Sequence, residues 1–212
     1  MTPEAPSQAR SDTIRADLRL IAGMVEPGAR VLDVGTGNGT LLDILVNERG
    51  AVGRGIELSQ AGVNACVRHG LSVVQGDADT DLKDYPTRAF DYVVLSQTLQ
   101  ATYAPKRVLQ HLVRIGTHAI VSFPNFGHWR VRADLALQGR MPRTGFLPEP
   151  WHETPNIHLC TLRDFTELAD ALDIRVEKAL SLDATGSAKR PHSGWPANLL
   201  AEHGLFLLTH RA

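Results

Sequence analysis

The residues best suited to chemistry in this chain form a glycine-rich segment after a short apolar run. In order, the segment holds Asp33, Val34, Gly35, Thr36, Gly37, Asn38 and Gly39. Glycines at this spacing allow a tight turn and a close approach of the backbone to a ligand. Gly39 would open the following helix, whose free N–H groups favour a carboxylate or a phosphate. The segment therefore predicts the floor of a nucleoside-type cofactor site, although a purely structural turn also fits the glycines alone.

Two ligand classes use such loops. The dinucleotide fingerprint Gly-x-Gly-x-x-Gly, counted from Gly35, needs a third glycine at position 40, where this chain has Thr40. The spacing Asp-x-Gly-x-Gly-x-Gly instead resembles motif I of the class I S-adenosylmethionine-dependent methyltransferases. That resemblance implies binding of S-adenosylmethionine (SAM) or S-adenosylhomocysteine (SAH).

Later strand ends agree with such a site. Glu57, followed by Leu58, lies about 20 residues after the loop, where an acid can accept hydrogen bonds from the ribose hydroxyls. An exposed charge at a strand end is the alternative for Glu57. The resemblance further implies that Asp77 and Ala78 face the adenine, and that the strand end at Ser96 lies beside the methionine moiety.

Alternating strands and helices must position these residues. Apolar runs predict strands at 30–34, 52–58, 72–75, 90–96 and 118–123, and helical spacing predicts helices at 12–25, 39–48, 60–69, 105–112 and 161–172. Two last strands, at 174–180 and 204–209, are joined by a stretch with poor helical patterning and suit an antiparallel edge hairpin. We therefore expect an α/β, Rossmann-like methyltransferase fold. Its sheet should be doubly wound, mostly parallel and seven-stranded, with helices on both faces.

Length, charge and composition narrow the function classes. The 212 residues suit one domain, expected over 12–212 after a disordered N-terminus at 1–11. A formal net charge of -1 gives no electrostatic case for nucleic acid or an anionic membrane as the main partner. There is no apolar run of the roughly 18–20 residues that a membrane span needs, and the N-terminus does not resemble a signal peptide. Cys66 and Cys160 fit a reducing compartment, so we expect a cytoplasmic protein.

An insertion at 124–158 exceeds the length of a usual connection and is rich in aromatic and basic residues. Trp129 and Trp151 are either core plugs or contact anchors. The arginines are either a solvated helix face or a site for a partner or an anionic ligand; they are Arg130, Arg132, Arg140 and Arg143. The histidines could suggest a metal site together with Glu153, but their spacing fits no ligand pair, so we expect hydrogen-bonding or pocket-lining roles and no metal. They are His128, His152 and His158.

Three strings are more specific than the glycine loop. They lie at 91–102 (DYVVLSQTLQAT), 121–130 (VSFPNFGHWR) and 154–161 (TPNIHLCT). Together they resemble the MetW family of methionine biosynthesis proteins, from about Arg30 to Leu182. The family often has Cys or Gly where this chain has Thr36, which still allows the turn. The resemblance implies a role in bacterial methionine synthesis, in support of homoserine O-acyltransferase (MetX), the enzyme that activates homoserine.

The sequence identifies no catalytic base. No Asn/Asp-Pro-Pro-Tyr/Phe motif follows the fourth strand and no Pro-Cys nucleophile is present, which disfavours methylation of DNA bases. A sulfonium is already activated, however, and alignment of donor and acceptor can carry most of the acceleration. Two hypotheses follow. The chain is either an accessory protein that binds SAM or SAH and contacts the acyltransferase through 124–158, or a small-molecule methyltransferase with 124–158 as lid and acceptor pocket.

Overall fold

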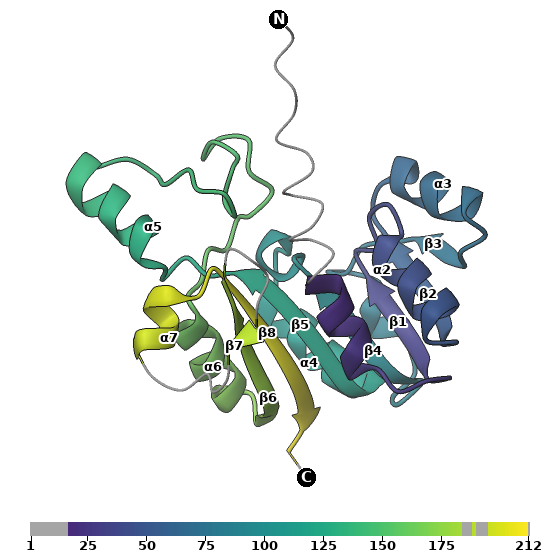
Figure 1. The fold of residues 1–212 in the computed structure, drawn as a ribbon. Helices are drawn as coiled ribbons and strands as arrows, with labels where there is room; N and C mark the ends of the chain where they lie inside the picture. The colour runs from purple at the N-terminus through teal and green to yellow at the C-terminus, as the bar shows by residue number, and fades with distance from the viewer. Residues whose placement is uncertain (1–16, 184–187, 190–194, 212) are drawn as a thin grey trace, which may run out of the picture.

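One sheet in the order β3-β2-β1-β4-β5-β8-β6-β7 organises the chain (Figure 1). The computed structural model describes residues 17–183, 188–189 and 195–211, so the N-terminus expected to be disordered at 1–11 lies outside the described residues. The first five strands pair in parallel; they are β1 (Arg30–Val34), β2 (Val52–Glu57), β3 (Val73–Gln75), β4 (Phe90–Ser96) and β5 (Gly116–Pro124).

The C-terminal strands complete the sheet in antiparallel fashion. β8 (His203–His210) lies between β5 and β6 (Ile174–Leu182) and runs antiparallel to both. A further two-residue strand, β7 (Ala188–Lys189), pairs with the outer edge of β6. The predicted doubly wound sheet, mostly parallel with an antiparallel C-terminal edge, is therefore confirmed, and β7 is a short addition to its seven main strands.

Helices cover both faces of this sheet, because successive strand residues point to opposite sides. Leu32 packs in the core cluster of α4 and α6, whereas Val31 packs in that of the helix over 17–24 and α2. The helices and turns on the two faces are α2 (Thr40–Asp43), its π-helical continuation η1 (Ile44–Glu48), α3 (Gln60–Arg68), η2 (Leu82–Asp84), η3 (Leu99–Ala101), α4 (Pro105–Ile115) and α6 (Leu162–Ala171). No helix in these described ranges is long and apolar enough to cross a membrane.

Two short helices were not predicted. The insertion contains α5 (Trp129–Ala133), continued by the π-helical η4 (Asp134–Gln138), and the stretch between the last two strands contains α7 (Trp195–Leu200). Only Val131 is buried in α5 and no residue is buried in α7, so neither has an apolar stripe that periodicity could reveal. Side chains from outside stabilise them instead. His128 Nδ1 accepts from the Arg130 N–H at the start of α5, and the Asn125 amide donates to a carbonyl of α7, that of Asn198.

Candidate functional site

The glycine-rich loop makes a closely packed turn at the carboxyl end of β1. Gly35, Gly37 and Gly39 have φ angles of 74°, 60° and 88°, in a backbone region that residues other than glycine rarely adopt. A Cβ atom at Gly35 would lie 2.6 Å from Thr98 Oγ1, so there the loop packs against the end of β4. Nothing lies within 4 Å of a Cβ at Gly37. The backbone at Gly37 is therefore open to the approach of a ligand.

Polar side chains of the loop fix its shape. Thr36 Oγ1 lies 3.0 Å from the Asp33 carbonyl and 3.2 Å from the Ile56 carbonyl, which joins the loop to β2. Asn38 Oδ1 accepts from the Thr40 N–H at 3.2 Å and from its hydroxyl at 2.8 Å, at the start of α2. Thr36 and Asn38 therefore hold the loop itself, and any contact of theirs with a ligand would be additional.

Glu57 is tied to the same loop. One carboxylate oxygen accepts from the Gly37 N–H and the other from the Ser59 N–H, both at 2.8 Å. Glu57 is half-buried, while the neighbouring Leu58 is 66% exposed. Each carboxylate oxygen can accept a further hydrogen bond. The side chain is thus more than an exposed charge at a strand end, and a ribose diol beside Gly37 would find acceptors there.

Asp33 is an acid buried beneath the loop. Its side chain is 2% exposed, and Asp33 Oδ2 has no hydrogen-bond partner among the described residues. Burial, together with the nearby Glu57 carboxylate, raises the pKa of Asp33 to about 7. A buried carboxyl without a partner is costly to ionise. An adjacent cation would stabilise its charged form.

The loop after β3 positions Asp77 and Ala78. Both are half-buried, and Ala78 packs against the core. Asp77 Oδ1 accepts from the Asp79 N–H at 2.8 Å. The Asp79 carboxylate in turn accepts from the N–H groups of Tyr103 and Ala104, each at 2.8 Å. The segment expected to face adenine is therefore joined directly to the segment that follows η3.

A second polar cluster lies at the ends of β4 and β8. Ser96 shares a 3.1 Å hydrogen bond with Ser122. Gln97 follows with a φ of 58° and donates to His203 Nδ1 at 3.2 Å, and its side chain also lies near the Asp17 carboxyl, whose pKa it lowers against the larger effect of burial. Burial raises the pKa of Asp17 to about 6 and lowers that of His203 to about 4. The cluster thus carries a buried carboxyl, that of Asp17, and a half-buried imidazole, that of His203, beside the predicted methionine end of the cofactor site.

Asp17 and His203 were absent from the predicted site. A signal for Asp17 was available, because it lies four residues before Ile21, on the apolar stripe of its helix, where an acid is out of place. His203 had no comparable signal, since its partner Gln97 is 106 residues away in sequence. Only the antiparallel return of β8 beside β5 brings it to the site.

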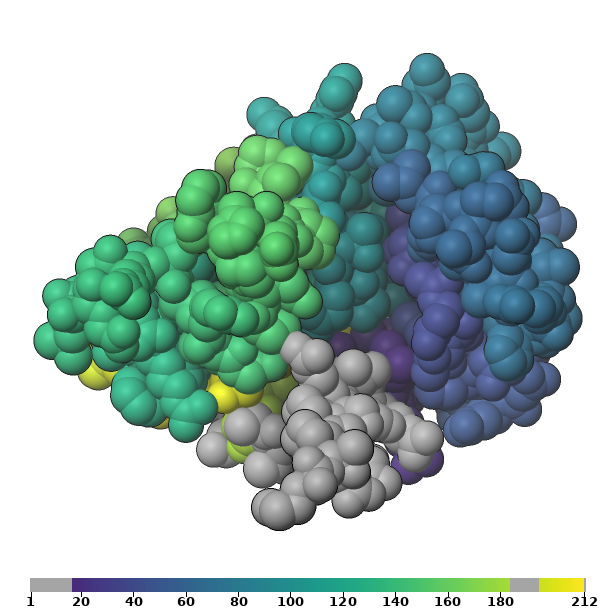
Figure 2. Space-filling model, turned by 90° about the horizontal axis from the view of Figure 1, so that it is seen from above, coloured from purple at the N-terminus to yellow at the C-terminus, as the bar shows by residue number. Residues whose placement is uncertain are grey.

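The parts of the chain that carry these residues border a hollow in the surface. In Figure 2 the molecule is hollowed between the insertion, in green, and the purple to blue residues that run from β1 to α3. Teal residues near the end of β4 lie between them. Two cavities, of about 530 and 490 Å³, lie elsewhere: one beside α6 and α7, the other at the amino ends of β1, β2 and β4. The predicted cofactor site is thus an open groove at the carboxyl ends of parallel strands, the usual ligand position in such sheets.

The exposure of side chains in the insertion separates core positions from surface positions. Trp129 and Trp151 are 47% and 71% exposed, so neither is a core plug. Arg130 and Arg132 lie on the exposed face of α5, whereas Arg140 and Arg143 are exposed beyond the end of η4.

The three histidines of the insertion have different surroundings. His128 is buried with its ring edge-on to Phe146, which also contacts His203. His152 is exposed and lies 3.8 Å from Glu153, and the His158 N–H donates to the Gln100 carbonyl at 2.9 Å. Throughout the described ranges, no three His, Cys, Asp or Glu side chains are placed to hold a metal ion.

The three specific strings meet at the base of the insertion. The Gln100 carbonyl accepts from the N–H groups of Ile157 and His158, and the Phe126 N–H donates to the Cys160 carbonyl. Gln100 is buried, and its side-chain amide donates to Pro124 O at 3.0 Å. Segments far apart in the sequence thus form one hydrogen-bonded unit, which fixes both ends of the insertion to the sheet.

Comparison with known proteins gives a family for these strings. The model of the family described as methionine biosynthesis protein MetW matches residues 15–208. The bifunctional methionine biosynthesis protein MetXA/MetW of Rhodopirellula baltica is 32% identical over 190 residues. The match covers 85% of this chain but 30% of that relative, so this chain corresponds to less than a third of it.

Solved structures share the fold at low sequence identity. A SAM-dependent methyltransferase from Thermotoga maritima aligns with a TM-score of 0.68 at 13% identity, over 96% of this chain and 91% of that one. One from Mesorhizobium loti has a TM-score of 0.65 at 17% identity, over 91% and 97%. The cyclase SpnF has a TM-score of 0.66 at 18% identity, over 98% and 84%. At these identities the likeness establishes the fold and leaves the chemistry open.

Proposed function

Since the chain belongs to the MetW family of methionine biosynthesis proteins, we propose that it binds SAM or SAH and supports or regulates homoserine O-acyltransferase. The observation that carries the partnership is the relative whose name joins MetXA to MetW in one chain. Two activities fused in one relative are candidates for association as separate chains in another. Such a biosynthetic partner implies a cytoplasmic protein, and we propose neither nucleic acid nor a membrane as a partner.

The groove residues suit the proposed cofactor. The open backbone at Gly37 allows close approach, and the Glu57 carboxylate beside it would accept from the ribose hydroxyls. Asp77 and Ala78 would border the adenine, and Ser96 the methionine moiety. Asp33, whose buried Oδ2 has no hydrogen-bond partner in the described part of the chain, would gain from a positive charge nearby. SAM, when bound, supplies an activated methyl group, whereas SAH carries none.

The test is complex formation between the two purified proteins. We expect this protein to co-elute with homoserine O-acyltransferase on size exclusion, and the acyl-transfer rate to rise when it is added. Both measurements should be made without cofactor, with SAM and with SAH. No co-elution and no rate change under any of these conditions would rule out the accessory role.

A small-molecule methyltransferase is the second candidate. The observation in its favour is that the insertion borders the same hollow as the predicted cofactor residues (Figure 2). In this reading Phe146, which contacts both His128 and His203, would help to line an acceptor pocket. The deciding measurement is formation of SAH from SAM in the presence of small molecules extracted from cells, since an accessory protein should produce none.

A further inference from the structure

Exposed apolar side chains are concentrated on the insertion and beside it. Of the thirteen large exposed hydrophobic residues in the described part of the chain, seven lie at Tyr103 or within 126–158. Tyr103 is 81% exposed, Trp151 71% and Ile157 50%. Large exposed apolar groups in one region mark an interaction site more often than scattered ones do. This region is therefore the strongest candidate for a contact surface.

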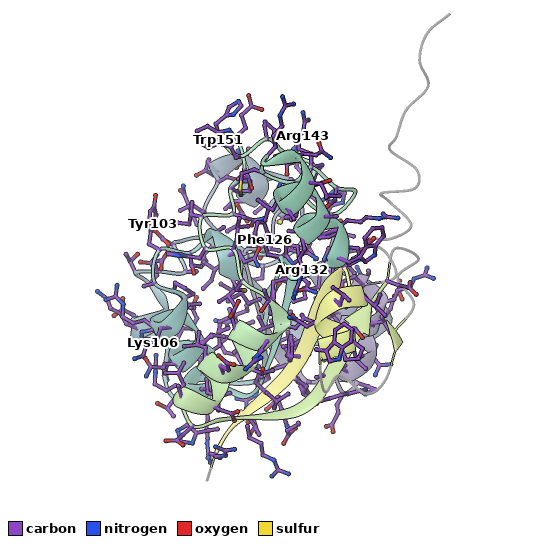
Figure 3. The ribbon with its side chains drawn as sticks, turned by 90° about the vertical axis from the view of Figure 1, so that its left-hand side faces the viewer. Tyr103, Lys106, Phe126, Arg132, Arg143 and Trp151 are labelled. Atoms are coloured by element: carbon purple, nitrogen blue, oxygen red, sulfur yellow. The ribbon has the colours of Figure 1, made fainter. Side chains whose placement is uncertain are left out.

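Two of these residues, Tyr103 and Ile157, lie on segments that are bonded to each other although they are distant in sequence. The Ile157 N–H donates to the carbonyl of Gln100, three residues before Tyr103. In Figure 3, Tyr103, Lys106 and Trp151 project outward along one side of the molecule. We name the surface formed by Tyr103, Lys106, Trp151 and Ile157 the Tyr103–Trp151 face.

The backbone under this face is held in place. The Asp79 carboxylate accepts from the Tyr103 and Ala104 N–H groups, and the Gln100 carbonyl accepts from those of Ile157 and His158. A surface that is ordered before binding loses less conformational entropy in a complex. Tyr103 and Ile157 thus stand on a preorganised backbone, as contact anchors do.

The charge of the region indicates the chemistry of its partner. Residues 103–107 and 126–158 hold six Lys and Arg against three Asp and Glu, whereas the whole chain has 22 against 23. The basic residues are Lys106, Arg107, Arg130, Arg132, Arg140 and Arg143. Basic groups around apolar anchors complement an acidic surface with apolar pockets.

We propose that the Tyr103–Trp151 face is the docking surface for homoserine O-acyltransferase, through an acidic patch of that enzyme with a pocket for an aromatic side chain. The inference rests on the proposed function, and the fused relative selects this partner. The face is also joined to the cofactor groove by hydrogen bonds, because the Asp79 N–H donates to Asp77 and the Asp79 carboxylate accepts from the Tyr103 N–H.

The experiment compares two exposed tryptophans. Trp151→Ala removes an anchor of the face, and Trp195→Ala removes a tryptophan of similar exposure, 74%, on α7 outside it. The affinity of each variant and of the wild type for the purified acyltransferase is measured by isothermal titration calorimetry. Circular dichroism checks that each variant is folded, and SAH affinity checks the groove. We expect Trp151→Ala to weaken the complex by at least about tenfold, as loss of a hot spot does, and Trp195→Ala to change it less than about twofold.

Each other outcome has a distinct meaning. Wild type that does not bind the acyltransferase would refute the proposed function itself. Wild type that binds, with Trp151→Ala unchanged or Trp195→Ala equally weakened, would refute only the placement of the docking surface. Self-association of the wild type that Trp151→Ala abolishes, measured by light scattering without the acyltransferase, would assign the face to a second copy of this chain and also overturn the proposal.

Discussion

Asp33→Asn should change the pH dependence of stability in a direction that the structure fixes. Asp33 lies buried beneath the glycine loop, and burial raises its pKa to about 7, with a further contribution from Glu57. Because the folded state binds this proton more tightly than the unfolded state, Asp33 stabilises the fold when protonated. That stabilisation is lost as the pH rises through 7. Asparagine resembles the protonated acid and does not titrate, so the variant should lack this loss.

The magnitude follows from the two pKa values. With a pKa of about 7 in the folded state and 3.8 in the unfolded state, the contribution of Asp33 falls by about 1.4 kcal/mol between pH 6 and pH 8. Asp17 and His203, with pKa values of about 6 and about 4 in the folded state, also change the free energy of unfolding in this pH range. Since wild type and variant share both groups, the difference between the two proteins isolates Asp33.

The assay is urea unfolding of the cofactor-free proteins at pH 6, 7 and 8. We expect the free energy of unfolding of Asp33→Asn, relative to wild type, to rise by about 1.4 kcal/mol across this range. Asp170→Asn is the matched control, since its side chain is 71% exposed, and its profile should run parallel to that of wild type. A parallel profile for Asp33→Asn as well would mean that Asp33 is already ionised in the folded protein, contrary to the argument from burial.

Further expectations concern the cofactor and the partner. SAM or SAH at about 100 times its dissociation constant should stabilise the protein by roughly 2.7 kcal/mol, and NAD should not; a thermal-shift response to NAD alone would refute the groove assignment. Glu57→Ala should weaken the binding of SAH, measured by calorimetry, about ten- to a hundredfold. Gly37→Val should block the approach of the ligand to the backbone and strain the turn. Unchanged SAH affinity in the Glu57 variant would show that Glu57 does not bind the ribose. Arg143→Glu should weaken acyltransferase binding and leave SAH affinity alone, whereas Arg175→Glu on β6 should affect neither; altered SAH affinity in Arg143→Glu would favour a lid. Asp79→Ala should reduce any effect of SAH on the affinity for the acyltransferase, measured by titration with and without SAH.

The sheet could be predicted because its signals are local. A strand buried on both faces, such as β4, reads as a continuous apolar run. The glycine loop could be predicted for the same reason, because the positive φ angles at Gly35, Gly37 and Gly39 favour glycine. The structure confirms the tight turn and its place at the carboxyl end of β1. The ligand of the loop remains a prediction.

The sequence could not show which polar groups meet. Thr36 and Glu57 bond backbone groups of the loop and of β2, a role that spacing does not reveal. The Gln97 bond to His203 depends on where β8 returns to the sheet. Likewise α5 and α7 depend on capping by distant or adjacent side chains and have no apolar stripe. Such tertiary hydrogen bonds have no periodicity, so pattern analysis finds the elements and misses these contacts.

Whether the cofactor is a substrate or a signal can be decided by linkage. The polar groups at the end of β4 bond one another, since Gln97 contacts both Asp17 and His203. With a pKa of about 4, His203 is neutral at pH 7, and its Nδ1 accepts from Gln97. A signalling cofactor must change the affinity for the acyltransferase, and the acyltransferase must then change cofactor affinity by the same factor. The Asp77–Asp79–Tyr103 hydrogen bonds directly connect the segments proposed to form the two sites. A cofactor that serves only as a methyl donor requires no coupling, so a change of acyltransferase affinity on cofactor binding would favour the signal, and its absence the methyltransferase.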